Sequence, residues 1–323
     1  MDRGDPSRMT SRTPIALTIA GSDSGAGAGV QADLKTFAAL GVYGASVVTA
    51  LTAQNTRGVR AVHCAPPDIV AAQIEAVLED FSVAAIKIGM LCSAEIAGVV
   101  AERLRRCPSP LAGEGGARSA TDEGSGAVRR HDERALRRRP LTPDPSPARG
   151  EGGRAFIIYD PVMAASSGEA LSGGGFVEAV RTKQLPIVDC LTPNLAEAAA
   201  LLGEPLARNE EDMARQGRAL MKLGPRAVVM KGGHLEGGEA VDLLVTTDAA
   251  HRYAAPRIAS NNLHGTGCTL SSAIAASIVL GLALPEAVAA ARAFVREAIK
   301  AGRGIELGAG PGPLIQTKLR APP

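Results

Sequence analysis

The residues best suited to chemistry lie in one short stretch, 262–269, with the sequence Asn-Leu-His-Gly-Thr-Gly-Cys-Thr. An apolar, Ala-rich run follows it and predicts a long helix. The two glycines let a ligand approach the backbone closely, and the first turn of a helix has N–H groups without partners inside the helix. Gly265, Thr266 and Gly267 are therefore expected to bind phosphate and to stabilise charge on a transferred group. The competing interpretation is a glycine-rich loop that only caps a core helix.

Cys268 falls in the first turn of that predicted helix. The positive end of the helix dipole favours a thiolate and lowers the pKa of the thiol, so Cys268 is a candidate base. Free cysteines are also among the most buried residue types, which leaves a structural role open.

Three further charged residues each follow an apolar run that is expected to be a strand: Asp160, Glu197 and Lys231. The two carboxylates are the kind of oxygen ligand that Mg²⁺ uses, here through water, and the lysine offers a positive charge for the phosphates of ATP. Taken singly, Asp160 is explained as a turn former, Glu197 as a first-turn helix residue and Lys231 as a surface charge. Together they predict phosphoryl transfer with ATP and Mg²⁺ as cofactors, although the chain has no G-K-[ST] motif.

The elements that must position these residues alternate between short apolar runs and amphipathic segments. Such alternation is typical of a mostly parallel sheet with helices on both faces. Open sheets of this kind bind ligands along the carboxyl ends of their strands, where the polar motifs fall. The expected strands are residues 15–20, 47–53, 84–88, 156–159, 187–191 and 227–230, with a hairpin at 241–245 and 251–254; the expected helices include 66–80, 93–106, one beginning after residue 267, and 285–301.

Composition excludes several classes of protein. The net charge is only +2 and aromatic residues make up 2%, which argues against a nucleic-acid partner. No apolar run is long enough to cross a membrane, and the N-terminus lacks the apolar core of a signal peptide. The five cysteines show no C-x-x-C pair, so neither a zinc site nor a disulfide framework is expected. These features predict a cytoplasmic protein with no membrane partner.

Residues 107–153 interrupt the pattern with a Pro-, Gly-, Ser- and Arg-rich segment that contains an internal near-repeat. This composition buries too little apolar surface to offset the entropy of ordering, so the segment is expected to be a disordered insertion. The predicted organisation is a disordered tail at 1–13 and a single domain at 14–323 that the insertion interrupts.

Seven motifs together closely resemble the bacterial hydroxymethylpyrimidine/phosphomethylpyrimidine kinases of thiamine biosynthesis, which belong to the ribokinase-like superfamily. The motifs are residues 20–35, 49–58, 87–91, 160–163, 192–197, 230–234 and 264–269. The resemblance implies a three-layer α/β/α sandwich and a homodimer. It also implies two ATP-dependent steps on one small-molecule pyrimidine, which give the monophosphate and then the diphosphate.

The resemblance also implies roles for individual residues. Gln54 matches the residue that contacts the edge of the aminopyrimidine, and an amide suits that edge because it donates and accepts. Asp33 matches an acidic pyrimidine contact, while Met90 and Val162 match positions that line the ring pocket. Cys268 occupies the place where sugar kinases of the superfamily carry an Asp base. The remaining matches are Asp160 and Glu197 in the magnesium region, and Lys231, Thr266 and Gly267 around the phosphates of ATP.

Two alternatives remain open. A pyridoxal kinase of the same branch would accept a ring with a similar hydroxymethyl arm. A ligand-binding protein without catalysis would keep the fold and lose the reaction. The sequence also departs from the family pattern: Ser166 stands where a Lys is usual, Leu263 replaces a usual Thr, and the first loop has Gly25-Ala26-Gly27 in place of Ser-Gly-Gly.

Overall fold

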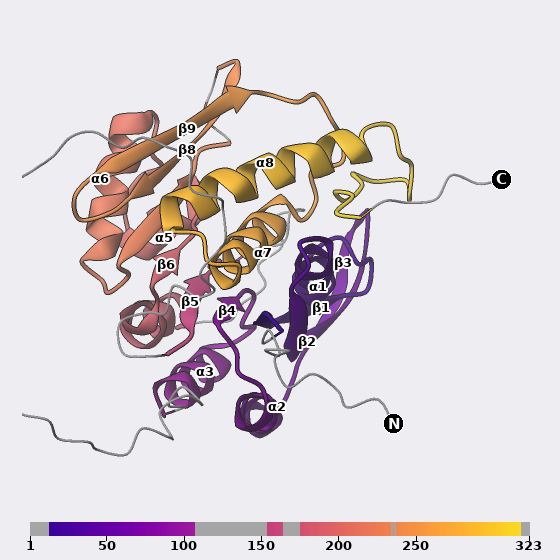
Figure 1. The fold of residues 1–323 in the computed structure, drawn as a ribbon, viewed down its shortest axis with the longest axis vertical. Helices are drawn as coiled ribbons and strands as arrows, with labels where there is room; N and C mark the ends of the chain where they lie inside the picture. Colours follow the sequence, from indigo (N-terminus) through magenta and orange to yellow (C-terminus); the bar gives the residue numbers. More distant parts are fainter. Residues whose placement is uncertain (1–12, 107–153, 164–174, 234, 236, 318–323) are drawn as a thin grey trace, which may run out of the picture.

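A nine-stranded sheet forms the centre of the described structure (Figure 1). The computed structural model describes residues 13–106, 154–163, 175–233, 235 and 237–317. The strands are β1 (Ile15–Asp23), β2 (Tyr43–Asn55), β3 (Gly58–Cys64), β4 (Ala85–Ile88), β5 (Phe156–Tyr159), β6 (Cys190–Leu191), β7 (Ala227–Lys231), β8 (Glu239–Val245) and β9 (Ala250–Pro256). Their order is β3-β2-β1-β4-β5-β6-β7-β8-β9. Strands β2 to β7 in this order are parallel, whereas β3, β8 and β9 pair antiparallel with their neighbours.

Helices cover both faces of this sheet, which confirms the predicted three-layer sandwich. The helices are α1 (Gly29–Ala39), α2 (Pro67–Asp80), α3 (Ala94–Arg106), α4 (Phe176–Ala179), α5 (Leu195–Leu202), α6 (Glu210–Met221), α7 (Thr266–Val279) and α8 (Leu284–Gly302). One apolar core joins the sheet to α2, α3, α5 and α6, and a second joins it to α1, α7 and α8. Every residue of α7 from Thr269 to Val279 is buried. Its small Ala and Ser side chains let α1 and α8 pack closely against it (Figure 1).

Most predicted elements are present. The short helix α4 and two further elements were missed, and the expected strand 187–191 is reduced to Cys190–Leu191. The hairpin of β8 and β9 is confirmed, as is the Asn194 cap, whose Oδ1 accepts from the N–H of Glu197 at 2.8 Å. The structure adds β3 and α6. Side chains of β3 are mostly exposed, so it has no apolar face to mark it in the sequence. Because β3 pairs with β2, Gln54 lies within a β-hairpin and not in a turn beyond the strand.

Cys64 and Cys92 form a disulfide, with their Cα atoms 5.9 Å apart. The prediction that the cysteines make no disulfide was therefore wrong. Cys64 ends β3, and Cys92 lies between β4 and α3. Nearby, the hydroxyl of Thr49 on β2 donates to the carbonyl of Met90 at 2.6 Å and holds the segment after β4 against β2, the neighbour of β3. Since the cysteines are 28 residues apart, only the sheet topology brings them into contact.

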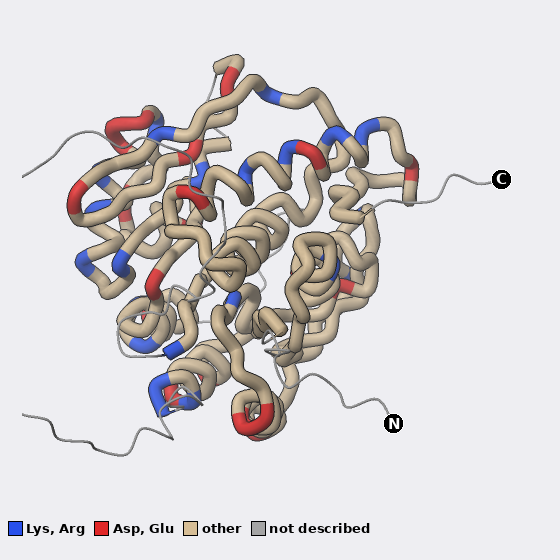
Figure 2. The backbone as a smooth tube through the Cα atoms, viewed as in Figure 1, with Lys and Arg blue, Asp and Glu red and all other residues tan. Residues whose placement is uncertain are grey.

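Charged residues of both signs are interspersed along the described backbone (Figure 2). This distribution fits the expectation of no nucleic-acid partner, which stays a prediction. One lysine departs from the usual surface location: Lys87 on β4 is fully buried.

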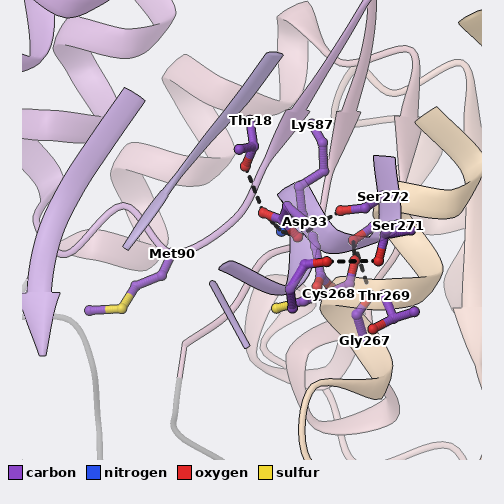
Figure 3. Close-up of polar contacts among 12 residues, drawn as sticks. Thr18, Asp33, Lys87, Met90, Gly267, Cys268, Thr269, Ser271 and Ser272 are labelled. Carbon is purple, nitrogen blue, oxygen red and sulfur yellow. Dashed lines mark hydrogen bonds and ion pairs between the residues drawn. The ribbon is translucent and has the colours of Figure 1, made fainter. Parts of the chain in front are cut away.

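A buried polar network ties α1, β1, β4 and α7 together (Figure 3). The Lys87 Nζ donates to both oxygens of Asp33, at 2.9 and 2.8 Å. The hydroxyls of Thr18 and Ser272 each donate to Asp33 at 2.6 Å. Burial alone would lower the pKa of the Lys87 ammonium, but the nearby Asp33 carboxylate outweighs burial and raises that pKa. Lys87 is therefore positively charged inside the core, with Asp33 as its hydrogen-bonded partner.

Replacing Lys87 with Met is expected to lower the free energy of unfolding by about 3–5 kcal/mol, because it leaves the Asp33 charge buried without a counter-charge. Urea denaturation measures this loss. The double variant Lys87→Met/Asp33→Asn should recover part of it, since the remaining amide is neutral and keeps hydrogen-bonding capacity. Lys300→Met is the matched control because its pair with Glu297 is largely exposed. Equal losses for Lys87→Met and Lys300→Met would contradict the stabilising role of the buried pair.

Candidate functional site

Two helix N-termini meet at Cys268. Helix α7 begins at Thr266 after Gly265, whose φ is 86°, and among the described residues no side chain caps it. A Cβ on Gly265 would lie 1.9 Å from the carbonyl oxygen of Gly27, so only glycine fits there. This contact places the start of α7 against the loop that leads into α1. The N–H of Gly29, the first residue of α1, donates to the sulfur of Cys268.

The pKa of Cys268 is shifted in the direction opposite to the sequence prediction: it is raised and not lowered. Burial raises the pKa of the thiol to about 11, while Lys87 and the N–H of Gly29 oppose the rise and Asp33 and Asp160 add to it. The helix-dipole argument was wrong about the net effect, because the free-energy cost of removing a thiolate from water exceeds the stabilisation by Lys87 and by the N–H of Gly29. Cys268 is a thiol at neutral pH in this structure.

Asp160, Lys231 and Glu197 form one cluster beside the glycine turn. The Lys231 Nζ lies 2.6 Å from Asp160 Oδ1 and 3.6 Å from Glu197 Oε2. A Cβ on Gly267 would lie 3.2 Å from the Lys231 Nζ and 3.4 Å from Asp160 Oδ2. The structure thus brings together residues from the ends of β5 and β7 and from the starts of α5 and α7.

Glu197 has a structural and an electrostatic role. Its Oε2 accepts from the N–H of Asn194 at 2.7 Å, which completes a capping box at the start of α5. Burial raises the pKa of Glu197 to about 7; Lys231 opposes the rise, and Asp160 adds to it. Burial alone would lower the pKa of Lys231, but Asp160 and Glu197 raise it above its ordinary value. The cluster combines two carboxyl groups with one firmly held positive charge.

The donor set fits a hydrated Mg²⁺ better than a fully dehydrated metal ion. In the described ranges no group of three or more His, Cys, Asp or Glu residues could hold a metal directly. Mg²⁺ keeps several of its water ligands and needs only one or two carboxylates, so Asp160 and Glu197 are sufficient in type and number.

The residues predicted to contact the ring lie on separate segments of the chain. Gln54 lies 3.3 Å from the imidazole Nε2 of His264, one residue before Gly265. Met90 is nearly buried, and its sulfur lies 3.1 Å from the position of a Cβ on Gly21, within β1. Val162 is partly buried against the core. Ser166 lies outside the described residues.

Asp33 does not present a free carboxylate oxygen to a substrate. Oδ1 accepts from Lys87 and Ser272, and Oδ2 accepts from Lys87 and Thr18, so both lone pairs of each oxygen are used. The side chain is also fully buried. The expected pyrimidine contact of Asp33 is not supported by this geometry, which gives Asp33 the role of counter-ion to Lys87.

Sequence reasoning missed three residues of this region: Lys87, Asp23 and His264. A single lysine in the otherwise apolar run 84–88 was a usable signal, because a lysine is almost never fully buried without a partner. Asp23 accepts from the N–H groups of Gly25, Gly27 and Ala28 and from His264. An Asp before a glycine-rich loop marks such a turn, but its partner 241 residues away does not show in the sequence.

None of the helices in the described part of the chain is both long and apolar enough to span a bilayer.

Comparison with known proteins gives a consistent result. The family model described as phosphomethylpyrimidine kinase matches residues 23–111 and 150–315. A hydroxymethylpyrimidine/phosphomethylpyrimidine kinase of Rhizobium meliloti is 46% identical over 302 residues, which cover 94% of this chain and 96% of the relative. The matched ranges include every predicted site residue.

Solved structures share the fold. The crystal structure of phosphomethylpyrimidine kinase from Clostridium difficile has a TM-score of 0.66 and 38% identity, covering 88% of this chain and 99% of the other. The pyridoxal kinase from Staphylococcus aureus in complex with AMP-PCP and pyridoxal has a TM-score of 0.73 and 28% identity, covering 94% and 93%. These neighbours confirm the ribokinase-like fold. With matches over most of its length to the family model and to the R. meliloti kinase, the chain belongs to the phosphomethylpyrimidine kinase family.

Proposed function

We propose that this protein uses Mg²⁺ and ATP to phosphorylate 4-amino-5-hydroxymethyl-2-methylpyrimidine and then its monophosphate, giving the diphosphate for thiamine diphosphate biosynthesis. The observation that carries the proposal is the meeting of Lys231 and Asp160 with Gly267 and Cys268 at the start of α7. Gln54 lies next to the same turn through His264. The relatives named as hydroxymethylpyrimidine/phosphomethylpyrimidine kinases support the choice of substrate.

In the first step the hydroxymethyl oxygen attacks the γ-phosphorus of ATP. An O–P bond forms, the bond from the γ-phosphorus to the bridging oxygen breaks, and ADP leaves. The backbone N–H groups of Gly265, Thr266 and Gly267 are placed to stabilise charge on the transferred group, and Lys231 pairs with phosphate oxygens. Mg²⁺, held through water by Asp160 and Glu197, would supply further positive charge at the phosphates.

Cys268 is placed to receive the proton of the attacking hydroxyl. Its pKa of about 11, which burial sets, makes the thiolate a minor species at neutral pH. Positioning and charge stabilisation therefore provide most of the rate enhancement, as is common in phosphoryl transfer. Gln54 contacts the ring edge, and Met90 and Val162 form the apolar wall of the ring pocket.

A pyridoxal kinase is the second candidate function, since structures of pyridoxal kinases share this fold with TM-scores of 0.73. A ligand-binding protein without catalysis is the third. We further propose a homodimer in the cytoplasm; the disulfide of Cys64 and Cys92 removes the absence of disulfides as an argument for that location. Strand β3 is an exposed edge of the sheet that a second copy could cover, and analytical ultracentrifugation tests this assembly.

Incubation of the purified protein with Mg²⁺, ATP and the hydroxymethylpyrimidine is expected to give both the monophosphate and the diphosphate, detected by mass spectrometry of the products. A parallel reaction with pyridoxal separates the candidates. Phosphorylation of pyridoxal alone would assign the second function, and no product from either ring would leave a binding role.

Replacing residues 107–153 with about six Gly and Ser residues is expected to leave kinase activity unchanged, because short connections are usual between a helix and the next strand. The family model also leaves residues 112–149 unmatched. The proposal is a single kinase domain at 14–323 with this segment as an insertion. Steady-state kinetics of the shortened and full chains, with circular dichroism as a check of folding, would reveal any loss of activity in a folded variant and so contradict the proposal.

Alkylation of Cys268 by iodoacetamide is expected to accelerate about tenfold per pH unit between pH 7 and 9.5, because the thiolate is the reactive form and its pKa, raised by burial, is about 11. Peptide mass spectrometry locates the modified residue. Cys190 is an internal reference, since burial raises its pKa to about 12 and the side chain is fully buried. An alkylation rate that levels off near pH 8 would mean that the two helix starts lower the pKa of Cys268 more than burial raises it.

A further inference from the structure

The amide of Gln54 is held between two polar side chains. In the structure its Nε2 lies 3.3 Å from His264 Nε2, and its Oε1 lies 3.2 Å from Thr52 Oγ1. The backbone of the same residue is clamped by Ser24, whose hydroxyl donates to its carbonyl at 2.7 Å and accepts from its N–H at 2.8 Å. The position of the amide is thus fixed, and its direction depends on which end carries the oxygen.

The hydrogen on His264 Nε2 determines which atom of the Gln54 amide faces His264. Asp23 Oδ2 lies 3.1 Å from His264 Nε2. Burial opposes ionisation of Asp23, but the hydrogen bonds from His264 and from loop N–H groups outweigh it and lower the pKa of the carboxyl. An ionised carboxylate only accepts, so His264 Nε2 carries a hydrogen. That one hydrogen lies between Asp23 Oδ2 and the Gln54 amide, and the two acceptors share it. Because a nitrogen that carries a hydrogen cannot accept one from an amide, the Gln54 atom that faces it is assigned as the oxygen.

The hydroxyl hydrogen of Thr52 determines which atom of the Gln54 amide faces Thr52. Its hydroxyl donates to the carbonyl of Ser22 at 2.9 Å. A hydroxyl has one hydrogen, so Thr52 can only accept from its second neighbour. The Gln54 atom that faces Thr52 must be the nitrogen. The two hydrogens have different partners and give the same direction.

We propose that His264, held by Asp23, is a positioning residue that turns the oxygen of the Gln54 amide toward itself and the nitrogen toward Thr52, and so sets the ring specificity of the site. This inference rests on the proposed function. In this direction Gln54 has one lone pair and one N–H left for a ligand. An aminopyrimidine matches both, with its amino group on the His264 side and the neighbouring ring nitrogen on the Thr52 side. Pyridoxal has no amino group beside its ring nitrogen and cannot make both hydrogen bonds.

Packing supports a fixed orientation of the imidazole. A Cβ on Gly27 would lie 2.4 Å from His264 Cδ2, so the ring fits against a glycine of the first loop. The main chain of His264 is also bonded, since its N–H donates to Gly312 and its carbonyl accepts from Leu314. His264 therefore has little freedom to turn away from Gln54.

A double-mutant cycle with Gln54→Ala and His264→Phe tests the proposal. His264→Phe removes the hydrogen-bond donor and keeps a flat ring, and we expect the KM for the pyrimidine to rise about tenfold, the effect of losing one orienting hydrogen bond. The KM for ATP should change less than about twofold, because His264 acts through the ring contact. The double variant should be no worse than Gln54→Ala. His251→Phe is the matched control, since that histidine is exposed on β9.

Additive effects of His264→Phe and Gln54→Ala, or equal rises in the two KM values, would overturn the proposal. If thermal unfolding shows that His264→Phe does not fold, Thr52→Val replaces it in the cycle, with the same non-additivity expected.

Turnover of the two ring substrates by the wild-type protein tests the proposed function separately from the double-mutant cycle. If it phosphorylates only pyridoxal, the aminopyrimidine assignment fails, and the cycle is repeated on pyridoxal, where additivity again overturns the positioning role. Turnover of neither ring rejects both. A crystal structure with the pyrimidine bound gives an independent test: an amino group nearest Thr52 overturns the proposed direction of the amide.

Discussion

The backbone contact between the first glycine loop and the start of α7 is the constraint on which the site depends. The carbonyl of Gly27 occupies the space where any other residue at position 265 would place its Cβ. The chain therefore brings the starts of α1 and α7 together without an intervening side chain. Gly267 in the first turn of α7 lies beside Asp160 and Lys231, while the first N–H of α1 donates to Cys268. A single backbone contact thus links the phosphate side of the site to the thiol.

At this junction burial and neighbouring charges shift the pKa values of buried groups in opposite directions, and which of the two is larger differs from group to group. The ammonium groups of Lys87 and Lys231 each have a carboxylate within hydrogen-bonding distance, so their pKa values rise despite burial. At Cys268 the Lys87 charge opposes the effect of burial without outweighing it, and burial raises the pKa of the thiol to about 11. Backbone N–H groups are partial charges, and they cannot replace a full counter-charge for a buried anion. The same helix starts are better suited to a phosphate, which carries its own charge and part of its own hydration.

The sequence was informative where local patterns carry the signal. Strands β1, β4, β5 and β7 are short apolar runs, and polar residues at their carboxyl ends do lie at one edge of the sheet, so the cluster of Asp160, Glu197 and Lys231 could be anticipated. Contacts between segments far apart in the chain could not. The disulfide of Cys64 and Cys92, the counter-ion role of Asp33 and the bond from His264 to Asp23 all depend on the strand order. The pKa of Cys268 was mispredicted because a helix dipole is visible in a sequence and the depth of burial is not.

Specificity cannot come from the fold alone, because a phosphomethylpyrimidine kinase and a pyridoxal kinase share it with this chain. The proposed pocket wall of Met90 and Val162 would distinguish rings only by size, and the two candidate rings are similar in size. Hydrogen bonds discriminate more strongly, since a ring that fails to match leaves buried polar groups without partners. The amide of Gln54 is the group best placed to do so, and an amide discriminates only when its direction is fixed. His264 connects that amide to Asp23 and lies one residue before Gly265, so the proposed sites of ring recognition and phosphate binding share one turn of chain.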